Sequence, residues 1–169
     1  MKYNLGCGFT KIPNYINCDN DEVVKPDLLL DLNKNDWFHK LENAEEICAY
    51  NVIEHLHDLD NFFINAYKAL NLHGKLIITV PCVFHENAFN DPSHVNYFTP
   101  KTFLFFSNND FSHYNTKKGY KFKLVKLKLT FSKGLLGMFF YSMMRFFSTG
   151  VSLSFVSEIK AEMEKLEQL

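Results

Sequence analysis

Three side chains in this sequence could take a proton from a substrate. His55 follows an apolar run that ends at Tyr50, whereas Asp91 and His94 lie in a long irregular segment from Cys82 to Thr99. Imidazole and carboxylate groups act as general bases, so we predict that His55, Asp91 and His94 form the catalytic set. Each has a structural alternative: His55 could bond a backbone carbonyl, and the other two could brace their loop.

The same segment also contains side chains of metal-binding type. His85, Glu86, Asp91 and His94 could in principle share an ion, but their spacing matches no zinc-binding pattern. We therefore predict no metal site. The cysteines are far apart and form no C-x-x-C pair, which is typical of small buried side chains in a reducing, cytoplasmic compartment. They are Cys7, Cys18, Cys48 and Cys82.

A glycine turn near the start of the chain could hold a ligand. The run from Lys2 to Leu5 reads as a short buried strand, and Gly6-Cys7-Gly8 follows it directly. Glycine lacks a Cβ, so the backbone can turn sharply there and approach a ligand closely. In open α/β sheets ligands bind just past the carboxyl ends of strands. A plain structural turn is the alternative interpretation.

Polar residues close the next three predicted strands. Asp19 ends the strand 15–18, Asp31 and Leu32 end the strand 27–31, and Asn51 and Val52 follow the strand 46–50. Carboxyl ends of parallel strands meet at one edge of a sheet, so we expect these residues to surround the glycine turn. Asp19 and Asp31 could also be ordinary turn residues.

Together these motifs resemble the class I S-adenosylmethionine-dependent methyltransferases over roughly residues 3–106. Leu5-Gly6-Cys7-Gly8 resembles their glycine loop, and N-V-I-E-H-L (51–56) resembles the segment after their fourth strand. I-P-N-Y-I-N-C-D (12–19), D-P-S-H (91–94) and F-T-P (98–100) resemble a compact subgroup of that family.

The resemblance implies S-adenosylmethionine as cofactor, with Asp19 accepting the ribose hydroxyls and Asp31-Leu32 contacting the adenine. It implies methyl transfer by in-line displacement to a small molecule or a sugar-containing (glycan) precursor. A non-catalytic methyltransferase-like subunit that serves a partner protein stays open as the alternative. The implied cofactor-binding residues are Gly6, Cys7, Gly8, Asp19, Asp31, Leu32, Asn51 and Val52.

The alternation of strands and helices predicts an α/β fold: a mostly parallel Rossmann-like sheet with helices on both faces. Only six residues, 9–14, join Gly8 to the second strand, so the usual first helix is missing or reduced to a turn. This argues against a dinucleotide enzyme, whose pyrophosphate rests on that helix. The other predicted elements are a helix 59–70 capped by Asp58, a strand 75–80, a helix 99–106, and a strand or hairpin 120–131 near the sheet edge.

We interpret the chain as one domain, 1–169, with a cofactor-binding core (1–131) and a C-terminal helical extension (132–169). Residues 157–169 are expected to form an amphipathic helix. The apolar segment 134–156 is interrupted by Arg145, which disfavours a spanning helix. We expect it to pack on the sheet or form a homodimer interface, and association with a membrane surface stays open.

The composition and net charge of the chain indicate which kinds of binding partner to expect. The chain of 169 residues is 47% hydrophobic and 22% charged, as soluble globular proteins are. Its net charge is -1, which favours neither a nucleic-acid partner nor an anionic membrane.

Overall fold

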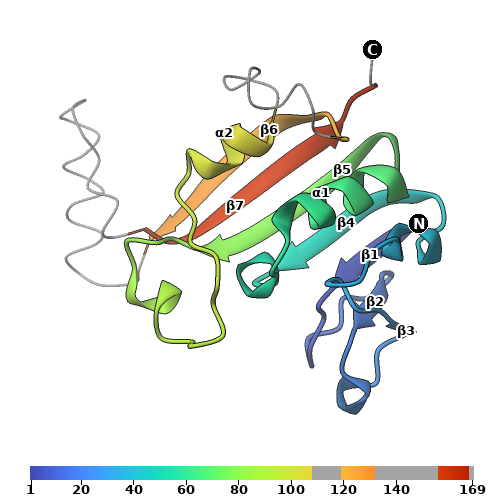
Figure 1. Ribbon diagram of the computed structural model, residues 1–169, viewed down its shortest axis with the longest axis horizontal. Helices are drawn as coiled ribbons and strands as arrows, with labels where there is room; N and C mark the ends of the chain where they lie inside the picture. Colours follow the sequence, from blue (N-terminus) through green and yellow to red (C-terminus); the bar gives the residue numbers. More distant parts are fainter. Residues whose placement is uncertain (108–118, 132–155, 168–169) are drawn as a thin grey trace.

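The framework of the molecule is one seven-stranded sheet (Figure 1). The computed structural model describes residues 1–107, 119–131 and 156–167. Across the sheet the strand order is β3-β2-β1-β4-β5-β7-β6. The strands are β1 (Lys2–Leu5), β2 (Ile16–Asp19), β3 (Leu28–Leu29), β4 (Ala44–Tyr50), β5 (Leu70–Pro81), β6 (Phe122–Phe131) and β7 (Val156–Lys165). In these residues the helices are α1 (Leu59–Ala69) and α2 (Thr102–Phe106), with 3-10 turns η1 (Glu22–Val24), η2 (Trp37–Lys40), η3 (Ile53–His55) and η4 (Glu86–Ala88).

Most strands of the sheet are parallel, which confirms the predicted Rossmann-like fold class. β1 pairs in parallel with β2 and β4, and the β2–β3 and β4–β5 pairs are parallel too. Only β7 runs antiparallel to its two neighbours, β5 and β6. Leu5 lies level with Cys18 on β2 and with Ala49 on β4. The carboxyl ends of these three strands therefore meet at one edge, although β4, not β1, is the middle strand.

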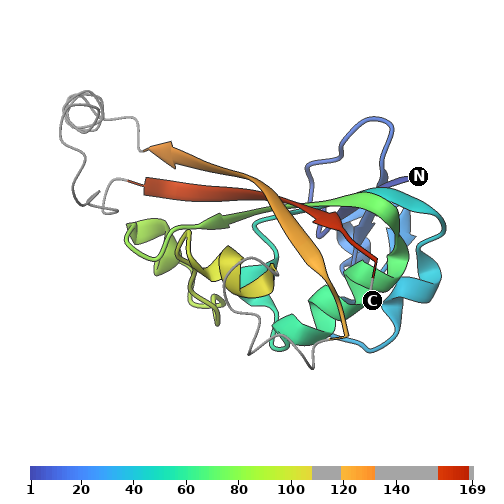
Figure 2. The same ribbon diagram turned by 90° about the horizontal axis from the view of Figure 1, so that it is seen from above.

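The helix α1 covers the core face of the sheet because its apolar residues recur at helical spacing. Asp58 caps it as predicted: the side chain accepts a hydrogen bond from the Asn61 backbone N–H at 2.9 Å. Phe62 and Phe63 are fully buried, and the Phe63 ring stacks on Phe106 of α2 with centroids 4.1 Å apart. The two helices thus pack side by side on the same face of the sheet (Figure 2).

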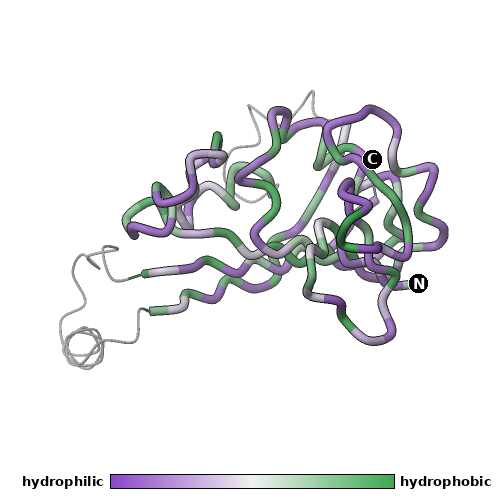
Figure 3. The backbone as a smooth tube through the Cα atoms, turned by 90° about the horizontal axis from the view of Figure 1, so that it is seen from below, coloured by the Kyte–Doolittle hydropathy of each residue, from purple (hydrophilic) through white to green (hydrophobic). Residues whose placement is uncertain are grey.

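The opposite face of β5, β7 and β6 is charged. Lys75 Nζ on β5 lies 3.0 Å from Glu162 Oε1 on β7, and Lys123 on β6 lies in register with Glu164. Figure 3 shows the resulting alternation of hydrophilic and hydrophobic residues along β6 and β7. No helix forms between Gly8 and β2, as the short connection predicts. In the described residues, then, α1 and α2 share one face instead of covering both as expected.

The predicted C-terminal helix over 157–169 is wrong, because residues 156–165 form the strand β7. Ile159, Ala161 and Met163 alternate along it and are all fully buried against the core face. Ile159 and Met163 lie four residues apart, a spacing that fits one helical face and also every second residue of a strand. The intervening glutamates and Lys160 point to the charged face, so the two-residue period is the one that the sheet selects.

The remaining elements differ from prediction mainly in their ends. Of the two predicted alternatives, a strand or a hairpin, β6 is one long strand at the sheet edge. Its lysines discourage pairing with other chains. α2 begins at Thr102, not at Thr99, whose N–H donates to the Thr102 hydroxyl. The segment 134–155, with its predicted dimer or membrane-surface role, lies outside the described residues. Within those residues, no helix has the length and apolar character needed to span a membrane.

Candidate functional site

The glycine turn after β1 is shaped by two different constraints. Both glycines have left-handed backbones, with φ of 62° at Gly6 and 49° at Gly8. A Cβ at Gly6 would lie 2.5 Å from Val52 Cγ2, so no side chain fits between the turn and the segment after β4. A Cβ at Gly8 would meet no heavy atom within 4 Å. Gly6 therefore allows close packing, and Gly8 opens onto free space where a ligand can lie against the backbone.

A cavity of about 280 Å³ lies at this edge of the sheet and collects most of the predicted cofactor residues. It is bounded by the carboxyl ends of β1, β2 and β4 and by the segment after β3. Its lining includes seven of the eight predicted cofactor residues, Cys7 being the exception, and also the predicted catalytic residue His55. The residues that line it are Gly6, Gly8, Asp19, Asn20, Leu30, Asp31, Leu32, Asn33, Asn51, Val52, His55 and Leu56.

Cys7 is part of the turn but faces away from this cavity. Its side chain is buried, and its backbone N–H donates to the Cys18 carbonyl oxygen at 3.0 Å. Burial raises the pKa of the Cys7 thiol, which keeps it neutral and unreactive. Cys7 thus ties the turn to β2. Its side chain does not line the cavity where a cofactor contact was predicted for it.

Asp19 fixes the glycine turn and still has capacity to bind a ligand. Its Oδ2 accepts from the Gly8 N–H at 2.8 Å, and its Oδ1 accepts from the Asp21 N–H at 3.0 Å. A carboxylate offers about four acceptor sites, so roughly two remain for hydroxyl donors in the cavity. Asp31 is held in a similar way, since its Oδ1 accepts from the Asn33 N–H at 3.0 Å.

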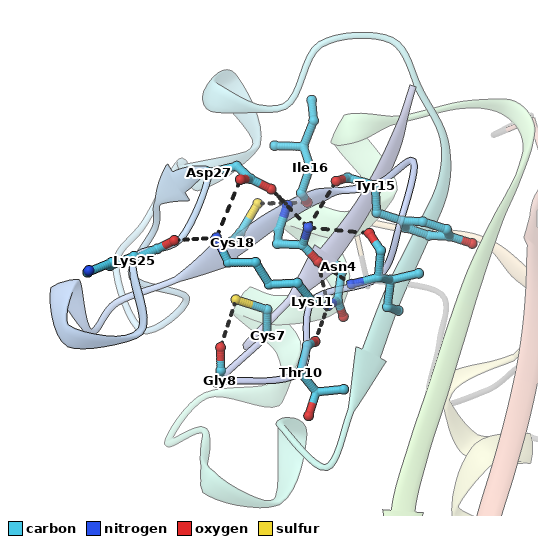
Figure 4. A network of polar contacts seen from close by, with 12 residues as sticks. Asn4, Cys7, Gly8, Thr10, Lys11, Tyr15, Ile16, Cys18, Lys25 and Asp27 are labelled. Carbon is cyan, nitrogen blue, oxygen red and sulfur yellow. Dashed lines mark hydrogen bonds and ion pairs between the residues drawn. The ribbon is translucent and has the colours of Figure 1, made fainter.

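A buried amide network takes the place of the missing helix (Figure 4). Asn17 Oδ1 accepts from Asn4 Nδ2 at 3.0 Å and from the Ile12 N–H at 2.8 Å. Asn17 Nδ2 donates to Asp27 Oδ2 at 2.8 Å, and Lys11 Nζ lies 3.6 Å from Asp27 Oδ1. The bonds from Asn17 hold the pKa of Asp27 below its ordinary value. This network ties residues 9–15 to β1 and β2, and the sequence patterns gave no sign of it.

A second cavity, of about 730 Å³, adjoins the first. Asn51 lines both, and the neighbours Glu54 and His55 line the second and the first respectively. The long loop 82–99 forms one wall, and the ends of β5, β6 and β7 form another. The residues that line it are Asn51, Glu54, Pro81, Asn87, Asn90, Asp91, Pro92, His94, Thr130, Ser157 and Glu158.

Glu54 is the functional candidate that the sequence interpretation missed. Its side chain is only 1% exposed, and neither carboxylate oxygen has a hydrogen-bond partner. Burial raises the pKa of Glu54 to about 7. Its backbone carbonyl accepts from the Val95 and Asn96 N–H groups at 2.8 and 3.0 Å, which docks the loop beside it. Its place next to His55 in the 51–56 motif was the available signal.

The structure brings the three predicted catalytic residues together. The His55 and His94 rings lie at 64° to each other with centroids 4.7 Å apart. Ser93 Oγ donates to Asp91 Oδ1 at 2.6 Å and lies 2.9 Å from His55 Nδ1. The one serine proton goes to Asp91, so His55 Nδ1 must carry its own proton and donate to Ser93. Bonds from Ser93 also hold the pKa of Asp91 below its ordinary value, which keeps it an acceptor.

The tautomer of His94 is fixed in the same sense. Its Nδ1 lies 2.9 Å from the Ala88 carbonyl oxygen, which can only accept, so Nδ1 carries the proton. In the neutral form of both histidines the unprotonated nitrogen is therefore Nε2, which can take a proton or bind an ion. His85 plays another part, since its Nδ1 accepts from the Asn87 N–H at 3.2 Å and caps η4.

Comparisons with known proteins support the fold. No protein-family model and no curated protein matches the sequence. Among solved structures, the chain is similar to an S-adenosylmethionine-dependent methyltransferase from Archaeoglobus fulgidus, with a TM-score of 0.61 at 15% identity over 97% of this chain and 85% of that one. One from Mesorhizobium loti gives 0.61 at 11% identity, over 97% and 90%. Coclaurine N-methyltransferase, bound to N-methylheliamine and SAH, gives 0.60 at 12% identity, over 97% and 67%.

Each of these three similarities extends over 97% of this chain. This chain has the fold of the class I S-adenosylmethionine-dependent methyltransferases.

Proposed function

We propose that this chain is an S-adenosylmethionine-dependent methyltransferase whose acceptor is a small molecule or a sugar-containing precursor. The observation that carries the proposal is the meeting of two cavities at Asn51. One is lined by the glycine turn and the strand-end carboxylates, and the other by groups able to take a proton. Methyl transfer needs such an arrangement, because donor and acceptor must lie in line.

The residues of the smaller cavity fit the cofactor. The open space at Gly8 leaves room for the cofactor against the backbone, and the free acceptor sites of Asp19 suit the two ribose hydroxyls. Asp31 and Leu32 are proposed to contact the adenine. When bound, S-adenosylmethionine supplies a methyl group on a positively charged sulfur.

His94 in the larger cavity and His55 beside it in the smaller one are proposed to orient the acceptor and remove its proton. The neutral form of each ring has its free electron pair on Nε2, and the Asp91–Ser93 pair fixes the His55 ring. Phe89 and Tyr97 do not line this cavity, but they lie on the same loop as His94, stack with centroids 5.0 Å apart and are 60% and 48% exposed. Exposed aromatic faces of this kind suit the apolar face of a sugar or a small ring.

Calorimetry with S-adenosylmethionine tests the proposal. Asp19→Ala should weaken binding by about 1.5–3 kcal/mol, the range for hydrogen bonds that involve a charged group. Asp21→Ala is the control, because Asp21 is a nearby carboxylate outside the cavity lining. Equal affinity of the wild type and a folded Asp19→Ala variant would refute the assignment. Cofactor binding with no turnover across an acceptor screen would favour the non-catalytic alternative.

A further inference from the structure

Three side chains of metal-ligand type converge between the two cavities. Glu54, His55 and His94 each offer one ligand atom, and these atoms lie within 4.8 Å of one another. Glu54 and His55 come from η3, and His94 comes from the loop 82–99. Two histidines and one carboxylate, with open positions left for other ligands, form a common set for zinc and for non-haem iron.

The two histidines are oriented as metal-bound histidines are. Such a histidine almost always donates its other ring N–H to a carbonyl, a carboxylate or water. His94 donates from Nδ1 to the Ala88 carbonyl oxygen, and His55 donates from Nδ1 to Ser93, which is held by Asp91. Each ring therefore has its tautomer fixed so that Nε2 has a free electron pair.

The carboxylate of Glu54 is a buried group without a partner. A buried, ionised carboxylate with no hydrogen bond is costly, and a cation beside it would remove that cost. The surrounding charges favour a cation as well. Asp91 and Glu158 line the same cavity, and no lysine or arginine is among its lining residues in the described part of the chain. Among the described lining residues, the charged side chains are therefore all acidic, apart from His94.

We propose that Glu54, His55 and His94 bind a divalent transition-metal ion, with its open coordination positions facing the 730 Å³ cavity. A tetrahedral zinc ion separates its ligand atoms by roughly 3.4 Å, so the three side chains close around the ion by about an ångström on binding. Imidazole nitrogen favours zinc, iron or nickel over magnesium.

This site revises the prediction that the chain holds no metal. That prediction considered only the loop residues His85, Glu86, Asp91 and His94. The proposed site keeps only His94 of these four residues and adds Glu54 and His55. A further consequence rests on the proposed function: an ion there lowers the pKa of an acceptor hydroxyl that enters the cavity.

The test is calorimetric titration of the full chain with Zn²⁺ after removal of bound metals with EDTA, supported by the visible absorption of Co²⁺. The wild type should bind one ion per chain. Glu54→Gln and His94→Gln should each weaken binding by at least ~100-fold, since each removes a direct ligand. His57→Gln is the matched control, because His57 is exposed and lies two residues from His55. It should bind as the wild type does.

A positioning variant separates a built site from a chance cluster. Asp91→Asn weakens the hold on Ser93 and should reduce ion affinity by about 10–100-fold, as loss of such outer partners typically does. The proposal is overturned if neither ion binds at millimolar concentration, or if folded Glu54→Gln binds as tightly as the wild type. An EDTA-treated chain that binds S-adenosylmethionine but no metal would overturn this inference and leave the proposed function standing.

Discussion

Glu54→Gln should stabilise the metal-free protein, and more so as the pH rises. The burial that raises the pKa of Glu54 from 4.5 to about 7 disfavours its charged form in the folded state. Each pKa unit corresponds to about 1.4 kcal/mol, so the difference between the two values is worth about 3 kcal/mol. Glutamine has nearly the same shape and never ionises, so the variant avoids this cost.

The direction of this pH dependence follows from whether the folded or the unfolded chain holds the proton of Glu54. Between pH 4.5 and 7 the folded chain keeps Glu54 protonated, whereas the unfolded chain has already released that proton. The wild-type free energy of unfolding therefore falls as the pH rises through this window and levels off above it. The advantage of Glu54→Gln should grow from about 1 kcal/mol at pH 5 to about 3 kcal/mol at pH 8. Of the groups nearby, Asp91 and Glu158 raise the pKa of Glu54 further, and His94 lowers it.

Urea unfolding in EDTA at pH 5 and pH 8 measures this difference. A gain of about 3 kcal/mol raises the midpoint by roughly 1–3 M, since urea m-values of small proteins are about 1–3 kcal/mol/M. Glu86→Gln removes an exposed carboxylate from the loop 82–99 and should change little at either pH. An equal effect of Glu54→Gln at both pH values, or destabilisation at pH 8, would show that Glu54 is not buried as described.

Three further outcomes are expected. Gly6→Ala should lower the free energy of unfolding by roughly 1–3 kcal/mol, because the added Cβ clashes with Val52. Adding Val52→Ala to the same chain should recover part of this loss. Purely additive losses in the double variant would contradict the packing argument. Asn17→Ala should cost about 1–3 kcal/mol in urea unfolding, because the Ile12 N–H loses its acceptor and Asn4 Nδ2 keeps only its bond to the Thr10 carbonyl oxygen. A neutral result would contradict the network. His94→Gln should lower the methyl-transfer rate by ~10²–10⁴ with cofactor affinity unchanged, and full turnover on the true acceptor would remove His94 from the catalytic set.

The lining of the 280 Å³ cavity could be predicted because its determinants are local. Two glycines fix the turn after β1, and the polar residues that end successive parallel strands must meet at one edge, whatever lies elsewhere. Asp19, Asp31 and Asn51 were found in this way. The lack of a helix between Gly8 and β2 also follows from a local fact, the shortness of the 9–14 connection.

The arrangement of side chains around the 730 Å³ cavity depends on contacts between residues far apart in the sequence. Glu54 is a charged residue that sequence patterns place on the surface, and it is buried because Val95 and Asn96, about forty residues later, dock on its carbonyl. Likewise the Ser93 hydroxyl links Asp91 to His55 only after the loop has folded back. Spacing along the chain contains no information about such pairings.

The position of β7 determines the order in which the sheet can be completed. β7 lies between β5 and β6, and Leu76 on β5 pairs with Met163 on β7. During translation at roughly 5–20 residues per second, the chain from Pro81 to Val156 takes about 4–15 s to make. Through that interval the strand that pairs with the outer edge of β5 in the folded protein has not been made. β6, made before β7, has its sheet neighbour only once β7 follows, so it joins the sheet with β7 or after it.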